Sequence, residues 1–68
     1  DERDTDRDSV RFFYIAKGSL AELRTQIEIA KSVGLMPAEI AETLQNQAII
    51  VGRRLGALIK ARSNQDHR

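Results

Sequence analysis

The stretch FFYIAKGSLAELRTQIEIAKSVG, residues 12–34, decides the fold of this 68-residue chain. Its apolar residues recur at spacings of three and four, the period of an amphipathic α-helix. No proline interrupts the stretch, and its final glycine suits the left-handed conformation that ends many helices. We therefore expect a helix over about residues 9–33, with Thr5 as its N-cap and Asp8 as the capping-box partner.

A second helix is predicted after a short connection. Pro37 suits the first position of a helix, Glu39 suits its positive end, and Leu35 is placed to pack on Ile40 as a hydrophobic staple. The helical period then continues, so the second helix should span about residues 37–62.

These two helices leave residues 1–8 as a polar acidic leader and residues 63–68 as a disordered tail. No stretch alternates in the way that indicates strands, so the fold class is all-α. A connection of about three residues forces neighbouring antiparallel packing. The unit is thus an antiparallel αα-hairpin, which we expect to form part of a four-helix bundle by self-association or with further helices.

Each helix carries one main apolar stripe, and the two stripes are expected to face each other. The first comprises Phe13, Ala16, Leu20, Leu23, Ile27 and Ala30, widened by Phe12; the second comprises Ile40, Leu44, Ala48, Val51, Leu55 and Leu58, with Ala41 and Ile59 beside it.

The first helix has more apolar surface than one partner can cover. A second line begins at Ile15 and ends beyond Ile29, with Ser19, Glu22 and Gln26 between them. Apolar ends with a polar middle suit a contact with another chain, in which the polar groups hydrogen-bond across the contact. The alternative is that the two isoleucines are ordinary partly exposed residues.

Glycines inside the helices also suggest close packing. Gly18, Gly52 and Gly56 each cost about 0.5–1 kcal/mol relative to alanine in a helix. A close neighbour could offset this cost, or a stable oligomer could tolerate it. The candidate interface residues are Ile15, Gly18, Ser19, Glu22, Gln26, Ile29, Gly52 and Gly56.

A chain of this size is expected to gain stability by self-association. A core of this size supplies only about 3–5 kcal/mol of net stability. The sequence has no cysteine for disulfides, and its lone histidine, His67, cannot build a structural zinc site. A homo-oligomer is therefore expected. With neither a long apolar run nor a signal peptide, we expect a cytoplasmic protein without a membrane partner.

Residue types that carry catalysis are missing from the sequence. There is no cysteine nucleophile, no histidine within the helices, no glycine-rich phosphate loop and no metal-binding histidine motif. We therefore expect no enzyme, no catalytic or metal-binding residues, no cofactor and no small-molecule substrate.

The motif Ile15-Ala16-Lys17-Gly18-Ser19-Leu20-Ala21-Glu22-Leu23 resembles a known family, together with Gln26, Ala30, Lys31, Gly34, Arg53, Leu55, Leu58, Ile59 and Lys60. The chain looks like the C-terminal half of the four-helix-bundle proteins encoded in bacterial 23S ribosomal RNA intervening sequences. A related branch comprises the accessory variability proteins of diversity-generating retroelements. The resemblance covers about residues 12–60 and implies a bundle that assembles into homopentamers, with nucleic-acid contacts in the retroelement branch.

Charge is unevenly distributed, although the net charge is only +1. Acids predominate in residues 1–8 and bases from Arg53 onwards. In an antiparallel hairpin these ends lie together, which favours mutual neutralisation. The alternative is contact with RNA or DNA, for which the candidates are Arg53, Arg54, Lys60 and Arg62. The sequence thus favours a non-enzymatic oligomeric helical-bundle scaffold, with a nucleic-acid-binding accessory protein as the alternative.

Overall fold

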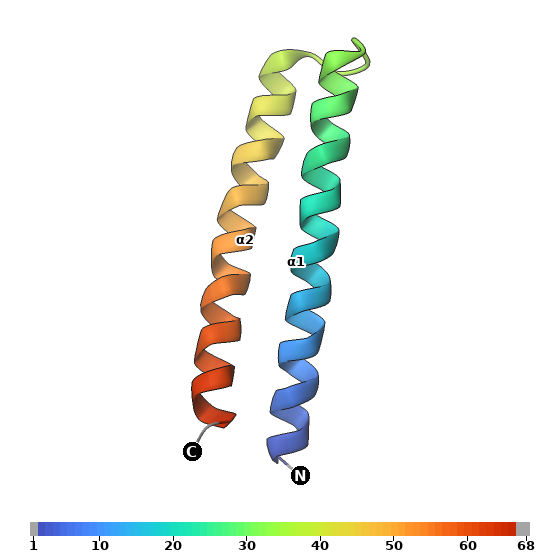
Figure 1. Ribbon diagram of the computed structural model, residues 1–68. Helices are drawn as coiled ribbons and strands as arrows, with labels where there is room; N and C mark the ends of the chain where they lie inside the picture. Colours follow the sequence, from blue (N-terminus) through green and yellow to red (C-terminus); the bar gives the residue numbers. More distant parts are fainter. Residues whose placement is uncertain (1, 67–68) are drawn as a thin grey trace.

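Two long antiparallel helices make up the protein in a computed structural model (Figure 1). The structure describes residues 2–66, and the side chains of residues 7–64. Helix α1 spans Glu2–Ser32 and helix α2 spans Ala38–Asp66. The helices lie side by side, with both ends of the chain at the same end of the hairpin. This arrangement confirms the all-α class and the helical hairpin.

Both helices extend beyond the expected bounds. Helix α1 begins at Glu2, so Thr5 lies inside the helix and does not cap it. Residues 2–8 contain neither glycine nor proline, and acids near a helix N-terminus are stabilised by the helix dipole. Helix α2 continues to Asp66 because no helix-breaking residue follows Gly56. The acidic leader and most of the expected tail are therefore helical; residues 1, 67 and 68 lie outside the described residues.

The end of α1 is a Schellman motif centred on Gly34. Gly34 has a φ angle of 80°, a left-handed conformation that L side chains rarely adopt. Its N–H donates to the carbonyl of Lys31 at 3.1 Å, and the N–H of Leu35 donates to the carbonyl of Ala30 at 2.9 Å. These bonds satisfy carbonyls that the helix end would leave without partners. The sequence prediction that Gly34 ends the first helix is confirmed.

The start of α2 differs in detail from the expectation. Pro37 precedes the helix, and its carbonyl accepts the N–H of Ala41 at 3.0 Å. Pro37 therefore occupies the cap position, so the helix begins one residue later than expected, and Glu39 lies in the first turn. Leu35 is 82% exposed, so the predicted staple onto Ile40 does not form.

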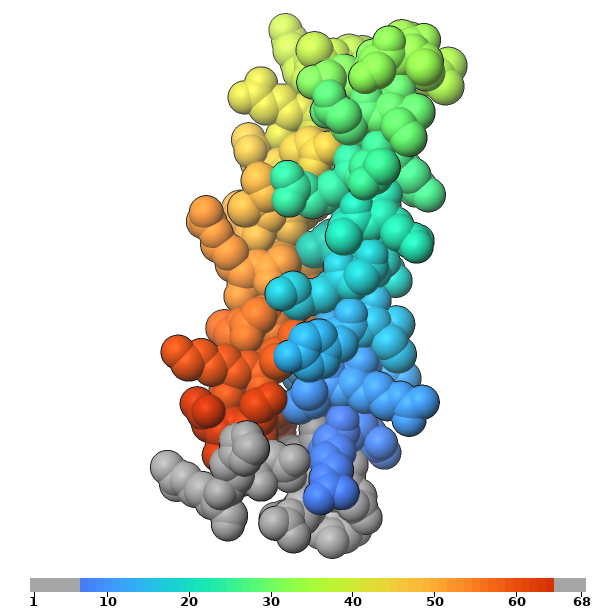
Figure 2. All heavy atoms as spheres, viewed as in Figure 1, coloured from blue at the N-terminus to red at the C-terminus, as the bar shows by residue number. Residues whose placement is uncertain are grey.

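The core of the hairpin is narrower than the two apolar stripes. Among the described residues only Ile27, Ala41, Ala48 and Ile59 are buried hydrophobics. In the space-filling view the side chains of the two helices meet along most of the hairpin (Figure 2). The core is thus a single line of contact and has no enclosed interior.

The face that α2 turns towards α1 is rotated from the expected stripe. The predicted residues Ile40, Val51 and Leu58 are between 42% and 52% exposed, whereas Ala41 and Ile59 are buried. Small residues on this face allow the helices to approach closely. Leu20 fills the space beside Gly52, where an added Cβ would lie 3.4 Å from its Cδ2.

Glycine substitutions test this description. Gly34→Ala should lower the free energy of unfolding by about 1–2 kcal/mol, because alanine must then adopt a left-handed conformation. Gly56→Ala should raise it by about 0.5–1 kcal/mol, since no heavy atom outside the local helix lies within 4 Å of the new Cβ. Urea unfolding followed by circular dichroism measures both changes. Destabilisation by Gly56→Ala would show that another chain packs against that glycine.

Candidate interaction surfaces

An open apolar groove runs between the helices on one side of the hairpin. It has a volume of about 310 Å³. We use the term apolar groove for its lining residues, which are Leu20, Leu23, Ile27, Met36, Leu44, Gln47, Ala48 and Val51. Gln47 is the only polar side chain among them.

The apolar groove is incompletely covered by the hairpin itself. Leu23 is 46% exposed and Val51 is 45% exposed, although both belong to the main stripes read from the sequence. Two helices share only one line of contact, so residues on the flank of that line have no third element against which to pack. Ile50 is similarly exposed, at 49%, but lies about 100° around α2 from Val51 and does not line the groove. The exposed apolar surface is therefore concentrated on one face but not confined to it.

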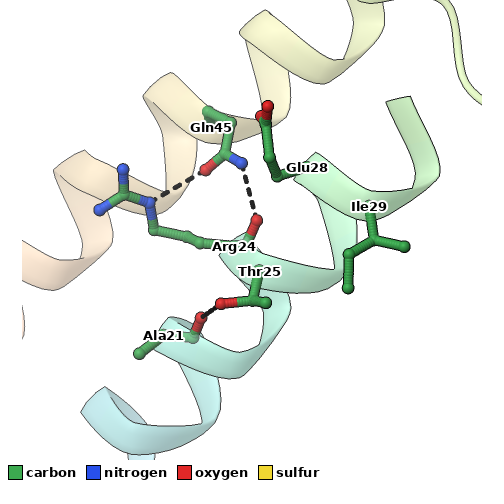
Figure 3. A pocket seen from close by; sticks show the side chains of 6 residues that line it. All are labelled: Ala21, Arg24, Thr25, Glu28, Ile29 and Gln45. Atoms are coloured by element: carbon green, nitrogen blue, oxygen red, sulfur yellow. Dashed lines mark hydrogen bonds between the residues drawn. The ribbon is translucent and has the colours of Figure 1, made fainter. Parts of the chain in front are cut away.

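A pair of hydrogen bonds joins the helices on the other side of the contact line (Figure 3). Arg24 donates from Nε to Oε1 of Gln45 at 2.9 Å. Gln45 in turn donates from Nε2 to the carbonyl of Arg24 at 2.8 Å. These two hydrogen bonds fix the axial register of α1 relative to α2. Arg24 thus bonds across to α2, whereas Lys31 and Glu28 pair along α1, at 3.4 Å.

Positive charge gathers on the same side as these hydrogen bonds. A second hollow of about 450 Å³ has a floor of small residues, including Gly52 and Gly56. Lys17, Arg24 and Arg53 line it, and no acidic side chain does. We call this hollow the basic groove. A shallower depression next to it is lined by Thr25, Glu28 and Ile29 as well as by Arg24 and Gln45.

The interface candidates from the sequence do not all lie together. Ile15, Gly18, Ser19, Glu22, Gln26 and Ile29 are all exposed on α1. Gly52, in contrast, lies inside the hairpin against Leu20, and Gly56 is half-buried in the basic groove. Gly52 thus serves the contact between the chain's own helices.

The nucleic-acid candidates are also divided. Arg53 lines the basic groove, and Lys60 follows it by seven residues on the same side of α2. Arg54 is exposed about 100° further round the helix. Arg62 is half-buried and already engaged in an interaction. The four residues therefore do not form one surface, whereas Lys17 and Arg24 join Arg53 from the other helix.

Sequence reasoning missed two features of these surfaces. Leu44, Gln47 and Val51 were not proposed as interface residues, because an apolar stripe is ordinarily assigned to the core. The hydrogen bonds between Arg24 and Gln45 could not be predicted from the sequence. The two residues are 21 apart in the chain, and their contact depends on the register between the helices. Gln47, which adjoins the second stripe three residues after Leu44 and four before Val51, was a signal that this face is not a closed core.

The fold and its surfaces define a class of protein: a helical hairpin with one apolar face left uncovered, as in part of a larger bundle. Residues 1–57 match the family described as 23S rRNA-intervening sequence protein. The chain belongs to this family. The match begins at residue 1, so it includes the acidic segment that the resemblance alone left outside. Comparisons with curated proteins and with solved structures give no match.

Two further observations concern the described residues. Neither helix has a stretch sufficiently long and apolar to cross a membrane. Within the same residues, no three side chains of the types His, Cys, Asp or Glu are grouped so as to hold a metal ion.

The bond between Arg24 and Gln45 can be tested with two glutamines on α2. Gln45→Ala should lower the free energy of unfolding by about 1 kcal/mol, because it removes both hydrogen bonds between the helices. Gln47→Ala is the matched control, since Gln47 lines the apolar groove and is not part of that pair. Chemical unfolding of the two variants should show a lower free energy of unfolding for Gln45→Ala only. Equal losses would contradict a stabilising role for the pair.

Proposed function

We propose that this chain is a non-enzymatic assembly module whose apolar groove is covered by a second copy of the hairpin, completing a four-helix bundle. The observation that carries the proposal is the imbalance of burial. Four hydrophobic residues are buried in the described part of the chain, whereas eleven large ones are exposed. Membership of a family described only as an intervening-sequence protein supports a role without chemistry of its own.

The energetics favour coverage of the groove. Complete burial of a leucine or valine side chain contributes about 1.5–3 kcal/mol, and Leu23 and Val51 each retain close to half of their exposure. Gains of this size on both copies are comparable to the total stability of a core of this size, about 3–5 kcal/mol. Association would therefore contribute a large share of the stability of the folded chain.

A second copy suits the groove because the hairpin supplies the same apolar face on both sides of the contact. A symmetric dimer needs one patch that is complementary to itself. Leu23 and Leu44 line its two walls and Gln47 provides one polar group within it, so the same residues would supply both sides of such a contact. In the assembled bundle, the two helices of each copy would cover the apolar groove of the other copy.

Adjacent residues of α2 provide the test. Val51→Asp places a charge in the groove and should convert the oligomer into monomer in sedimentation equilibrium. Ile50→Asp is the matched control, because Ile50 has nearly the same exposure but does not line the groove, so this change should leave the mass unchanged. Circular dichroism checks that both variants remain helical. A wild-type chain that is monomeric at high concentration would refute the proposal.

A second function is favoured by the basic groove. We propose as the alternative that the chain binds a nucleic acid through its phosphates. Three cationic residues from two helices line it without a lining acid, and lysine and arginine bind phosphates by charge and hydrogen bonds. Lys60 extends this positive surface along α2. The apolar groove lies on the other side of the contact line, so binding there is compatible with self-association.

Neighbouring arginines test this alternative. Arg53→Gln should weaken binding to a short single-stranded RNA and lower the salt slope by about 1, because one phosphate contact is lost. Arg54→Gln makes the same charge change outside the groove and should have a smaller effect. Fluorescence anisotropy across a salt series measures both. Equal effects, or no binding near physiological salt, would rule out the basic groove as a phosphate site.

A further inference from the structure

A row of exposed residues crosses α1 diagonally and leads into the basic groove. It comprises Arg11, Tyr14 and Lys17, which follow one another at a spacing of three. Successive members of such a row are turned by about 60° around the helix and lie about 4.5 Å apart along it. Lys17 lines the basic groove, and Arg11 lies on the outer side of Tyr14. We call these three residues the α1 row.

Tyr14 is an aromatic residue that the hairpin does not use for its core. Its side chain is 59% exposed. Tyr14 precedes Ala21 by seven residues, or about two turns, so the two residues lie on the same side of α1. Since Ala21 lines the basic groove, Tyr14 is placed beside the end of that groove that is nearer to the start of α1.

The surface beside Tyr14 is open. Gly18 follows Tyr14 by four residues, the spacing at which side chains on a helix are neighbours. Side chains on a helix lean towards its N-terminus, so a larger residue at position 18 would cover the surface next to the ring. A Cβ added at Gly18 would meet no heavy atom within 4 Å outside the local helix. A flat group therefore has room to approach the ring from this direction.

The two neighbours of Tyr14 in the row are cations. Arg11 and Lys17 are exposed, and among the side chains that the structure describes neither takes part in a salt bridge. No acidic residue occurs in the sequence between Asp8 and Glu22. Arg53 adds a further cation from α2, where it lines the basic groove together with Lys17. The row is therefore positively charged on both sides of an exposed aromatic ring.

This alternation of charge and aromatic surface is complementary to a single-stranded nucleic acid. Such a strand carries a negative phosphate at every nucleotide, and its unpaired bases can stack on aromatic side chains. In a duplex the bases stack on one another, so the ring would find no free base. A membrane surface also attracts cations, but a helix that binds one presents large apolar residues to the lipid. The residues that follow Tyr14 on this side of α1 are Gly18 and Ala21, which are too small for that purpose.

We propose that the α1 row binds a single-stranded nucleic acid, with one base stacked on Tyr14 and the adjoining phosphates bound by Arg11 and Lys17. This binding mode rests on the alternative function, phosphate binding in the basic groove, and specifies the class of nucleic acid. Beyond Lys17 the strand enters the groove, where Arg53 contacts a further phosphate. Because every base has an aromatic face, the stacking position accepts any base.

Variants of the two exposed aromatic residues test the stacking. Tyr14→Ala should weaken the binding of a short fluorescein-labelled single-stranded RNA about 5- to 100-fold, the effect of losing one stacked base. Tyr14→Phe keeps the ring and should bind as the wild type does. Phe12→Ala is the matched control, because Phe12 is 67% exposed but lies about 160° around α1 from Tyr14, and it should leave the affinity unchanged. Fluorescence anisotropy measures the affinities, and circular dichroism checks that the variants remain helical.

Further probes separate stacking from phosphate binding. An abasic strand of the same length keeps the phosphates without the bases, and a duplex keeps its bases paired, so Tyr14→Ala should leave the binding of both unchanged. An equal loss on all three probes, or no loss on the single strand, would overturn the stacking and leave phosphate binding intact. Tighter binding to phosphatidylserine vesicles than to the single strand would assign the row to a membrane and also overturn it. Absence of binding to every nucleic acid near physiological salt would refute the alternative function itself.

Discussion

The close contact between the helices at small residues of α2 is the constraint on which the rest of the structure depends. Ala41 and Ala48 are almost completely buried, and Gly52 leaves room for Leu20. Because large side chains of α2 do not fit where these small residues lie, Leu44 and Val51 lie on the flank of the contact line. The bond between Arg24 and Gln45 fills one flank, and the apolar groove forms the other. One local choice of side-chain size thus gives the hairpin two chemically different sides.

This division separates the two kinds of interaction that the surface offers. The apolar side gains free energy by excluding water, a driving force that depends little on salt. The basic side acts through charge and is screened by salt. An assembly that covers the apolar groove leaves Lys17 and Arg53 accessible, and repeats them once per copy. Self-association would in this way increase the density of positive charge without a change in the sequence.

The sequence predicted the helical class, the hairpin and the helix end at Gly34, because those depend on local patterns. It did not predict which side of each apolar stripe is buried. Ile40 and Val51 have the period of a core and are nevertheless half-exposed, since the rotation of α2 is fixed by Ala41 and Ala48. Likewise, Arg53 and Arg54 are adjacent residues of the same type, and the sequence does not distinguish them. Only the fold shows that Arg53 lines a groove together with Lys17. Local signals determine the elements, whereas the register between them determines the surfaces.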